Sequence, residues 1–409
     1  MDKKMVPEVR FKGFTDDWEQ HKLGEFYNFK NGLNKEKAFF GSGVPIVNFV
    51  DVFHNRFLMP DMLMGRVTLT EKEIKSHEVK QGDIFFTRTS ETINEIGYPS
   101  VMLGIPDCTV FSGFVLRGRA IGNDPLNNLF KSYIFFTEHF RKEMIKKSSM
   151  TTRALTSGTA LKEMIIKFPV SENEQTNIGT LFKHLDVGIT LQQLQIDCFL
   201  KLRKELIQQI FPSNKAILPK IRYANFSSSW EQHKLKEVTQ EVNDKSSDGE
   251  LLSVTINDGI VKNSTLERKN NSSKDKSKYK KVEIGDIAYN SMRMWQGASG
   301  ISRYSGIVSP AYTVFRVNKN VLNNIFLGYL IKTPEMTWKF RINSQGLTSD
   351  TWNLKYPLFS EINIRIPSLK EQICLANLLR SVDKTIDSQQ KQLKTLKSLK
   401  KYLLQKLFI

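Results

Sequence analysis

The sequence is poor in the residues that build metal sites and disulfide frameworks. Its three cysteines, Cys108, Cys198 and Cys374, lie far apart and form no CxxC pair. None of its six histidines has the HxxxH or HExxH spacing of a metal site. We therefore predict neither a disulfide framework nor a zinc site, and no bound metal in this chain.

Long apolar runs are missing as well. No segment approaches the roughly 18 consecutive apolar residues that a membrane helix needs. Residues 1–14 are charged and lack the apolar core of a signal peptide. We expect a cytoplasmic chain that does not enter a membrane. Its 409 residues, 40% of them hydrophobic and 25% charged, are enough for two or three folded domains.

Signatures of catalysis are absent with one weak exception. The chain contains no [DNS]PP[YFW] tetrapeptide and glycine-rich cofactor loop of an adenine methyltransferase, and no GxxxxGK[ST] loop for ATP. Asp61, which follows Pro60, has the spacing to Glu73 and Lys75 of a PD and ExK nuclease motif that could gather carboxylates around Mg²⁺. The motif is short and has no equivalent later in the chain, so a metal-dependent nuclease remains the least favoured alternative.

Acidic residues are outnumbered. Sixty Lys and Arg stand against 42 Asp and Glu, which gives a formal charge of +18. Such a balance draws a protein toward polyanions, nucleic acid above all, although charge alone is weak evidence.

The chain is a tandem repeat. The hexapeptide WEQHKL occurs at residues 18–23 and again at 230–235. A further match precedes each copy, PEVRFKGF at 7–14 and PKIRYANF at 219–226. A GDI tripeptide at 82–84 recurs at 285–287. His21 and His233 lie inside the repeated hexapeptide, and without companion ligands they do not indicate a catalytic or metal site. We expect Trp18 and Leu23 to pack each domain's start against the end of a long helix.

Residues 174–211 and 371–408 match without a gap and predict two long helices. Their apolar residues recur at alternating spacings of four and three, the seam of a coiled coil. The interruptions of the seam coincide, Gln192 with Gln389 and Arg203 with Lys400. A helix of about 40 residues would run roughly 60 Å, and Pro212 ends the first one.

Strand-like runs such as GDIFFT and PAYTVFRV alternate with helical candidates at 128–147 and 323–340, which predicts globular parts of mixed α/β type. The expected fold class is α+β, with two such domains related by pseudo-twofold symmetry and joined by two antiparallel coiled-coil helices. The predicted divisions are residues 1–171, 172–212, 213–368 and 369–409.

The order and duplication of these motifs resemble the specificity subunit of type I restriction-modification enzymes over nearly the whole chain. The resemblance implies two target recognition domains, each reading one half of a split, asymmetric double-stranded DNA sequence. It implies helices that set the spacing and hold two methyltransferase subunits, with two motor-nuclease subunits completing the complex. S-adenosylmethionine, ATP and Mg²⁺ would serve those partners, and this chain would have no catalytic residue and no cofactor.

The candidate DNA contacts lie just beyond each GDI strand and in two equivalent polar loops. Arg can bond guanine O6 and N7, and Asn or Gln can bond adenine N6 and N7. The candidates are Thr87, Arg88, Thr89, Ser90, Arg153 and Ser157 in the first copy and Asn290, Ser291, Arg293, Trp295, Gln296 and Gln345 in the second. On the helices, we expect subunit contacts at Gln192, Phe199, Arg203, Gln389, Leu396 and Lys400. The basic run 267–281 is a further phosphate contact or a solvated loop.

A second class of function stays open at this point: a coiled-coil adaptor that binds proteins and whose basic charge is incidental. The two copies differ most between the helices, the hexapeptide and the GDI turn. This pattern favours a shared scaffold with divergent reading surfaces.

Overall fold

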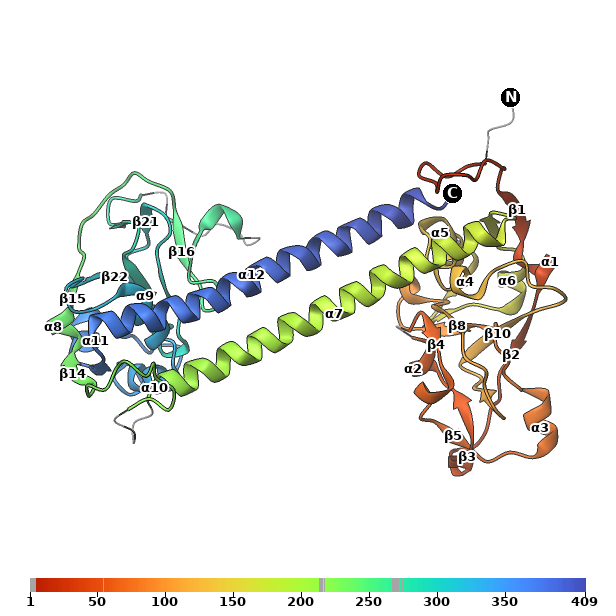
Figure 1. Ribbon diagram of the computed structural model, residues 1–409, viewed down its shortest axis with the longest axis horizontal. Coiled ribbons are helices and arrows are strands. Elements are labelled where there is room, and N and C mark those ends of the chain that lie inside the picture. Colours follow the sequence, from red (N-terminus) through yellow and green to blue (C-terminus); the bar gives the residue numbers. More distant parts are fainter. Residues whose placement is uncertain (1–4, 54, 213–215, 217, 267–271, 274) are drawn as a thin grey trace. The chain divides into compact units, whose positions relative to one another are not determined.

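The computed structural model describes residues 5–53, 55–212, 216, 218–266, 272–273 and 275–409. The chain divides into two compact units: unit 1 is Met1–Gln193 with Lys391–Ile409, and unit 2 is Leu194–Gln390. Each unit holds one globular part and a segment of both long helices (Figure 1). Both globular parts are mixed α/β, so the predicted fold class is confirmed. Within the described ranges no helix is long and apolar enough to span a bilayer.

Unit 1 is built on a five-stranded sheet of order β2-β10-β6-β8-β4, in which only the β4–β8 pair is parallel. Its strands are β1 (Glu19–Lys22), β2 (Tyr27–Asn31), β3 (Phe40–Val47), β4 (Phe57–Leu58), β5 (Arg66–Val67), β6 (Ile84–Thr87), β7 (Thr89–Ser90), β8 (Pro99–Met102), β9 (Val110–Phe111), β10 (Val115–Ala120), β11 (Ser149–Met150), β12 (Ala154–Leu155) and β13 (Ile165–Phe168). Its short helices are α1 (Leu23–Phe26), α2 (Phe49–Val52), α3 (Glu71–Ser76), α4 (Asn128–Ile134), α5 (Glu138–Lys147) and α6 (Gly158–Lys162). One face of the sheet packs on α4 and α5, where Phe86 meets Phe135 and Phe140.

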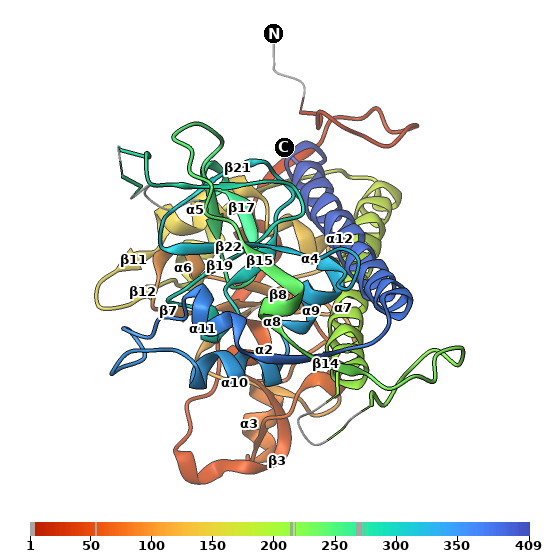
Figure 2. The same ribbon diagram turned by 90° about the vertical axis from the view of Figure 1, so that its left-hand side faces the viewer.

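Unit 2 repeats this plan with a four-stranded antiparallel sheet of order β15-β22-β19-β20 (Figure 2). Its strands are β14 (Glu231–Lys234), β15 (Thr239–Glu241), β16 (Leu252–Val254), β17 (Ile260–Lys262), β18 (Lys280–Val282), β19 (Ile287–Asn290), β20 (Ser299–Ile301), β21 (Gly306–Val308), β22 (Tyr312–Val317) and β23 (Asn363–Ile366). Its helices are α8 (Leu235–Val238), α9 (Asn324–Leu330), α10 (Pro334–Ile342) and α11 (Tyr356–Ser360). Of the basic run 267–281, residues 267–271 and 274 lie outside the described residues.

The two long helices are α7 (Glu172–Ile210) and α12 (Leu369–Lys406). The seam predicted from the heptad spacing faces inward: Phe182 and Ile210 of α7 are fully buried, while the polar positions between seam residues are exposed. Within unit 1, Phe182 meets Phe408 with ring centroids 5.8 Å apart, and further along α7 Asp186 binds Lys400. The two helix segments of unit 1 therefore run antiparallel.

The two charged seam interruptions, Arg203 and Lys400, form ion pairs with the opposite helix segment. In unit 2, Arg203 Nε donates to Asp383 Oδ1 over 2.5 Å, and the hydroxyl of Tyr329 donates to the other oxygen of Asp383 over 2.6 Å. In unit 1, Lys400 binds Asp186 in the same way. A cation is tolerated at each of these seam positions because a carboxylate of the opposite helix segment neutralises its charge.

The repeated hexapeptide is a structural junction. Residues 19–22 form β1, which pairs antiparallel with β13, the strand that precedes α7; β14 and β23 pair in the same register in unit 2. Trp18 and Leu23 are buried, and the Trp18 indole Nε1 donates to Glu174 near the start of α7 over 3.4 Å. Trp230 is buried against Phe326 in the second copy. Trp18 also packs on Phe408, just past the end of α12, with ring centroids 6.2 Å apart, so its expected packing at the end of a long helix is confirmed.

The repeated GDI turn is explained by backbone geometry and one ion pair. Gly82 has φ +86° and Gly285 has φ +93°, conformations that residues with a side chain rarely adopt. The aspartate after each glycine accepts hydrogen bonds from an arginine of the neighbouring strand. Asp83 binds Arg119 at 2.6 and 2.7 Å, and Asp286 binds its counterpart Arg316. Both carboxylates are nearly buried, so the turn is anchored to the sheet.

Two of the expected helices are broken. The candidate at 128–147 becomes α4 and α5, because Thr137 caps α5 by accepting the backbone N–H of Phe140. The candidate at 323–340 becomes α9 and α10, where Thr333 is the cap and Pro334 occupies the first turn. Each threonine lies between two helices and caps the second one. The apolar spacing continues across it, so the sequence did not reveal the break.

Candidate nucleic-acid interface

In unit 1, the segment after the GDI strand and the predicted polar loop are paired. Strand β7 lies beside β12, with Ser90 opposite Ala154 and Thr89 opposite Leu155, and β12 pairs with β11 to form a hairpin. The backbone N–H of Thr156 donates to the carbonyl of Arg88 over 3.1 Å. Two candidate stretches about 60 residues apart in sequence therefore form one three-stranded surface.

Several of the predicted hydroxyls hold this surface together. The Thr87 Oγ1 is buried and accepts the N–H of Tyr98 over 2.8 Å, and Ser90 Oγ accepts the N–H of Thr92. Ser157 caps α6 by accepting the N–H of Ala160 over 3.1 Å. These side chains shape the loop, and their oxygens are engaged with backbone donors.

The arginines of unit 1 are placed differently. Arg88 is half-buried and Arg153, at the hairpin tip, is exposed. Among the residues that the structure describes, neither side chain makes a hydrogen bond or ion pair, so both guanidinium groups keep their donors for a ligand. Thr89 lies between them on β7 and is half-buried. Arg88 and Arg153 remain the candidates for base contact on this unit.

Unit 2 brings together the equivalent segments. The backbone N–H of Leu354 donates to the carbonyl of Ser291 over 2.9 Å, as Thr156 does to Arg88 in unit 1. Gln345 and Asn353 exchange backbone hydrogen bonds of 3.0 and 2.7 Å and close a hairpin. The loop after β19 and the polar loop 343–352 are therefore neighbours here too.

The candidates of unit 2 also divide into supports and free groups. Ser291 is buried against Thr313, and Asn290 Oδ1 accepts the N–H of Met292 over 3.0 Å. Arg293 Nη1 donates to the carbonyl of Met292 over 3.2 Å and is half-buried. Gln296 is exposed and has no side-chain hydrogen bond among the described residues.

An aromatic cluster supports the hairpin of unit 2. Trp295 and Trp352 meet edge to face with centroids 5.2 Å apart, and the Arg341 guanidinium lies 5.2 Å from the Trp352 ring. Trp295 Nε1 donates to the carbonyl of Met292. Trp295 therefore packs within the site. The sequence did not single out Trp352 and Arg341, although Trp352 ends the polar loop that it did indicate.

Arg141 is a support of unit 1 that the sequence did not reveal. Its guanidinium donates to the carbonyls of Asn94, Ile96 and Gly97 at 2.7–3.0 Å and pins the loop that follows β7. Burial lowers the pKa of Arg141 from its ordinary value. It is a framework residue, because its donors are turned toward the backbone.

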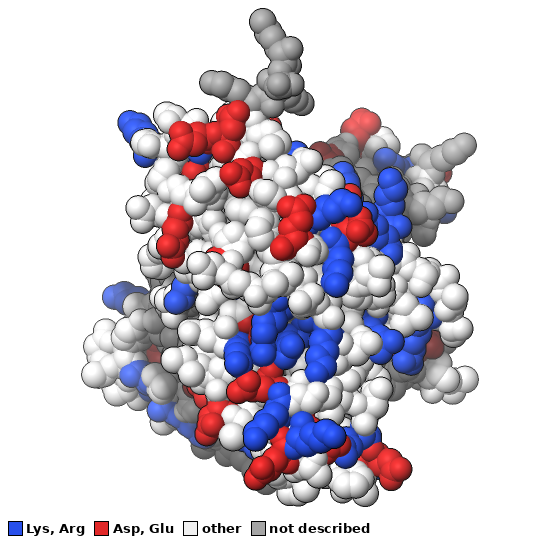
Figure 3. All heavy atoms as spheres, turned by 90° about the vertical axis from the view of Figure 1, so that its right-hand side faces the viewer, with Lys and Arg blue, Asp and Glu red and all other residues white. Residues whose placement is uncertain are grey.

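Basic side chains also gather elsewhere on unit 1. Burial, followed by the charges of Arg117 and Arg119, lowers the pKa of Lys30. Arg117 donates to the carbonyl of Glu78 over 2.7 Å, and its Nε has no partner among the described residues. Figure 3 shows a face of the protein on which Lys and Arg side chains cluster between acidic groups at its upper and lower edges. Such a cluster attracts phosphate.

Comparison with known proteins also indicates a DNA specificity domain. Residues 227–398 match the family model of the type I restriction modification DNA specificity domain. A curated relative, the type I restriction enzyme MjaVIII specificity subunit of Methanocaldococcus jannaschii, is 25% identical over 138 residues. That match covers 32% of this chain, and the chain spans about a third, 32%, of that relative.

Two solved structures have a similar fold. The S subunit of a type I restriction-modification system from M. genitalium superposes with a TM-score of 0.61 at 16% identity, covering 99% of both chains. The HsdS subunit from Thermoanaerobacter tengcongensis has a TM-score of 0.50 at 13% identity over 96% of each chain. Residues 227–398 therefore carry a type I restriction modification DNA specificity domain. The resemblance seen in the sequence is confirmed.

In the structure, Glu73 of the nuclease motif has another role. Glu73 belongs to a capping box with Thr70 at the start of α3 and pairs with Lys35 at 2.6 Å. Lys35 and then Thr70 lower the pKa of Glu73 to about 2. No group of three or more His, Cys, Asp or Glu residues in the described ranges could hold a metal ion. Both carboxylate oxygens of Glu73 are engaged, one with Lys35 and the other with Thr70.

The candidate residues on the two long helices differ in their contacts. Arg203 and Lys400 are engaged with carboxylates of the opposite helix segment. Gln192, Phe199, Gln389 and Leu396 are half-buried. Subunit contact at these six positions stays a prediction. The sequence missed the carboxylates that Arg203 and Lys400 bind, Asp383 and Asp186.

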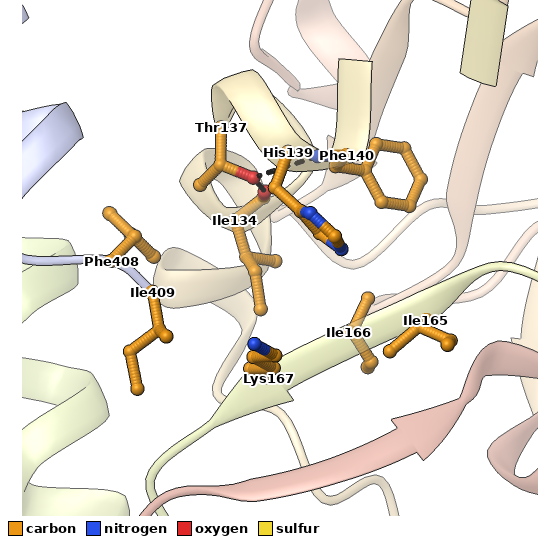
Figure 4. Close-up of a pocket in the computed structure, with 9 residues that line it drawn as sticks. All are labelled: Ile134, Thr137, His139, Phe140, Ile165, Ile166, Lys167, Phe408 and Ile409. Atoms are coloured by element: carbon orange, nitrogen blue, oxygen red, sulfur yellow. Dashed lines mark hydrogen bonds between the residues drawn. The ribbon is translucent and has the colours of Figure 1, made fainter. Parts of the chain in front are cut away.

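One concave feature of unit 1 is too small for a ligand. Where the chain end meets α5 and β13, a cavity of about 10 Å³ lies among Ile134, His139, Lys167, Phe408 and their neighbours (Figure 4). This volume holds roughly one water molecule. The equivalent pocket of unit 2 measures about 250 Å³ and is lined by Glu335, Lys339, Arg365 and others. Neither pocket includes a candidate DNA contact.

Proposed function

We propose that the chain is the DNA-sequence specificity subunit of a type I restriction-modification complex. Each unit reads one half of a bipartite, asymmetric double-stranded DNA target, and the long helices set the distance between halves and hold the methyltransferase subunits. The chain contributes recognition and its partners contribute catalysis.

The observation that carries this proposal is the contrast within the repeat. The repeated motifs, namely the hexapeptide and the GDI turn, are engaged in packing and ion pairs inside each unit. The segments that differ, around Arg88 and Arg153 in one unit and Arg293 and Gln345 in the other, form equivalent surfaces. A common frame with two dissimilar surfaces suits the reading of two dissimilar half-sites.

The partners and cofactors are part of the same proposal. We expect two methyltransferase subunits and two restriction subunits to assemble on the chain. S-adenosylmethionine would be used by the former, and ATP and Mg²⁺ by the latter. The complex would act on DNA in the cytoplasm.

The test is the methylation pattern that the chain imposes on DNA. The full chain is co-expressed with its methyltransferase subunits in a host without other adenine methylation, and modified bases are mapped by long-read sequencing. The expected result is one asymmetric split motif methylated at adenine, absent when this chain is omitted.

The alternatives give different results. Binding of proteins with no dependence on DNA, together with unmodified DNA, would support the adaptor. Mg²⁺-dependent cutting by the chain alone would support the nuclease. Either outcome would overturn the specificity role.

A further inference from the structure

The hairpin tip of unit 2 presents a leucine wholly to water. Leu347 is 100% exposed, the highest value among the exposed large hydrophobic residues of the described chain. Single exposed apolar residues are common and need no explanation by themselves. Two further features of the loop distinguish this one.

The first feature is that the loop holds its shape by its own bonds. Thr351 Oγ1 donates to the carbonyl of Thr348 and accepts its N–H, over 3.0 and 3.1 Å, and the N–H groups of Thr351 and Trp352 donate to the same carbonyl. Gly346 has φ +136°, and a Cβ there would lie 2.6 Å from the carbonyl oxygen of Thr351. The tip is an ordered turn that holds Leu347 away from the protein.

The second feature is the support behind the tip. The strand returning from the tip carries Trp352, which packs between Trp295 and the Arg341 guanidinium, as described above. Gln345, a candidate for reading adenine, is two residues before Leu347. The leucine thus projects from a braced surface that also bears candidate base contacts.

The corresponding hairpin of unit 1 presents Met150, 51% exposed, just before its tip, and the tip itself carries no apolar side chain. Its closing pair is Met150 and Ala154, four positions apart, whereas Gln345 and Asn353 are eight apart. The shorter tip consists of Thr151, Thr152 and Arg153. The exposed leucine therefore belongs to one half of the repeat, as a feature of one half-site would.

We propose that Leu347 inserts between two stacked base pairs in the half-site read by unit 2, partly unstacking them and bending the duplex. This inference rests on the proposed function. Apolar wedges of this size are used in this way by proteins that bend DNA, and they favour pyrimidine–purine steps, which unstack easily. Arg341, whose guanidinium lies over the Trp352 ring, supplies positive charge behind the tip, and Asp350 is the acidic residue within the loop. The duplex is favoured over a protein groove because the chain carries a formal charge of +18.

The test uses the full chain with its co-expressed methyltransferase subunits and duplexes that contain the motif found by methylation mapping. 2-Aminopurine, a base whose fluorescence rises on unstacking, replaces one base at a time in the half-site assigned to unit 2. For the wild type we expect a rise at one step. For Leu347→Ala we expect loss of that rise and roughly tenfold weaker binding, as for the loss of one specific base-pair contact.

Two variants serve as controls. Leu347→Met keeps an apolar side chain and should retain the fluorescence rise. Ile284→Ala removes an exposed apolar side chain, 70% accessible, at the start of the GDI turn, where β19 begins and the reading loop is absent. It should leave both fluorescence and affinity unchanged.

The outcomes separate the two proposals. Tight, motif-dependent binding with silent probes, or equal signals from wild type and Leu347→Ala, would overturn the insertion and leave the proposed function standing. The Leu347→Ala complex could instead lose a methyltransferase subunit, seen by size-exclusion chromatography, while the probe signals stay unchanged. This result would assign the leucine to a protein contact and also overturn the insertion. A wild-type complex that binds no duplex would refute the proposed function itself.

Discussion

Unit 1 and unit 2 share their anchors and differ in what the anchors hold. In both, an arginine upstream of the hexapeptide binds a buried glutamate near the start of a long helix: Arg10 with Glu174, and Arg222 with Glu371, all at 2.7–2.8 Å. The glutamine after each glutamate bonds to three backbone groups in both copies. Duplication has kept the contacts between domain and helix, because every recognition domain needs the same attachment.

The cores beneath the sheets have diverged. In unit 1, Lys131 is fully buried and binds Asp124 at 2.5 Å, and the Tyr27 hydroxyl donates to the same carboxylate. The equivalent residues of unit 2 are Leu327 and Asn320, with no ion pair between them. The same frame thus tolerates either a polar network or apolar packing at one site.

The largest effect is expected from breaking an anchor. Glu174→Ala leaves the Arg10 guanidinium and the Trp18 indole without their acceptor, so unit 1 should lose about 3–5 kcal/mol of unfolding free energy. Glu371→Ala should cost unit 2 somewhat less, since Trp230 Nε1 has no hydrogen-bond partner among the described residues to lose. Guanidinium unfolding followed by tryptophan fluorescence measures both. Equal and small losses of unfolding free energy in the two variants would show that water replaces the glutamate as hydrogen-bond partner at little cost.

The divergent core gives the next test. Lys131→Leu removes a buried cation whose partner Asp124 is exposed, and it should destabilise unit 1 by about 1.5–3 kcal/mol, because Asp124 and the Gly82 carbonyl lose a charged donor. Adding Asp124→Asn copies the residues of unit 2 and should restore most of the loss. Urea unfolding of the two variants measures the coupling. A double variant no more stable than the single one would mean that the two cores are not equivalent.

The reading surfaces should be separable. Arg88→Ala should weaken recognition of one half-site only, by about 1–3 kcal/mol if the guanidinium contacts a base, and Arg293→Ala should affect only the other. Methylation mapping with half-site variants measures this effect. A uniform loss across sequences would indicate phosphate contact instead.

The smallest difference concerns the repeated histidines. His21 nitrogens lie 2.9 and 2.8 Å from Glu19 and Glu25, bonds that raise the His21 pKa, whereas the His233 nitrogens lie 3.5 Å from their carboxylates. A raised pKa gives stability that is present below pH of about 6.5 and is lost as the pH rises through the folded-state value. His21→Gln should flatten this dependence by a few tenths of a kcal/mol, since exposed pairs are screened. His233→Gln is the matched control, and unfolding titrations from pH 5 to about 8 decide.

Much of the scaffold could be predicted from the sequence. Repetition gave the two copies, and the heptad spacing gave both long helices, because an apolar seam of that period has one helical solution. The division of each helical candidate at Thr137 and Thr333 escaped prediction, because a cap inside a continuous apolar pattern does not interrupt the spacing.

The site was predicted in part. The candidate segments beside Arg88 and Arg153 lie together, as do those beside Ser291 and Gln345. Their roles could not be assigned, because a hydroxyl such as that of Thr87 reads the same in sequence whether it accepts a backbone N–H or faces solvent. Base contact by the individual residues stays a prediction.

The sequence by itself determined the repeat, the mixed α/β class, the long helices and the positive charge, since each is set by local pattern or composition. Tertiary structure alone decided that β7 pairs with a hairpin some 60 residues later, which hydroxyls are buried and which arginines stay exposed. It also decided that Leu347 stands in water at the tip of an ordered turn. Long-range pairing and burial depend on contacts between distant segments, and no local pattern encodes these contacts.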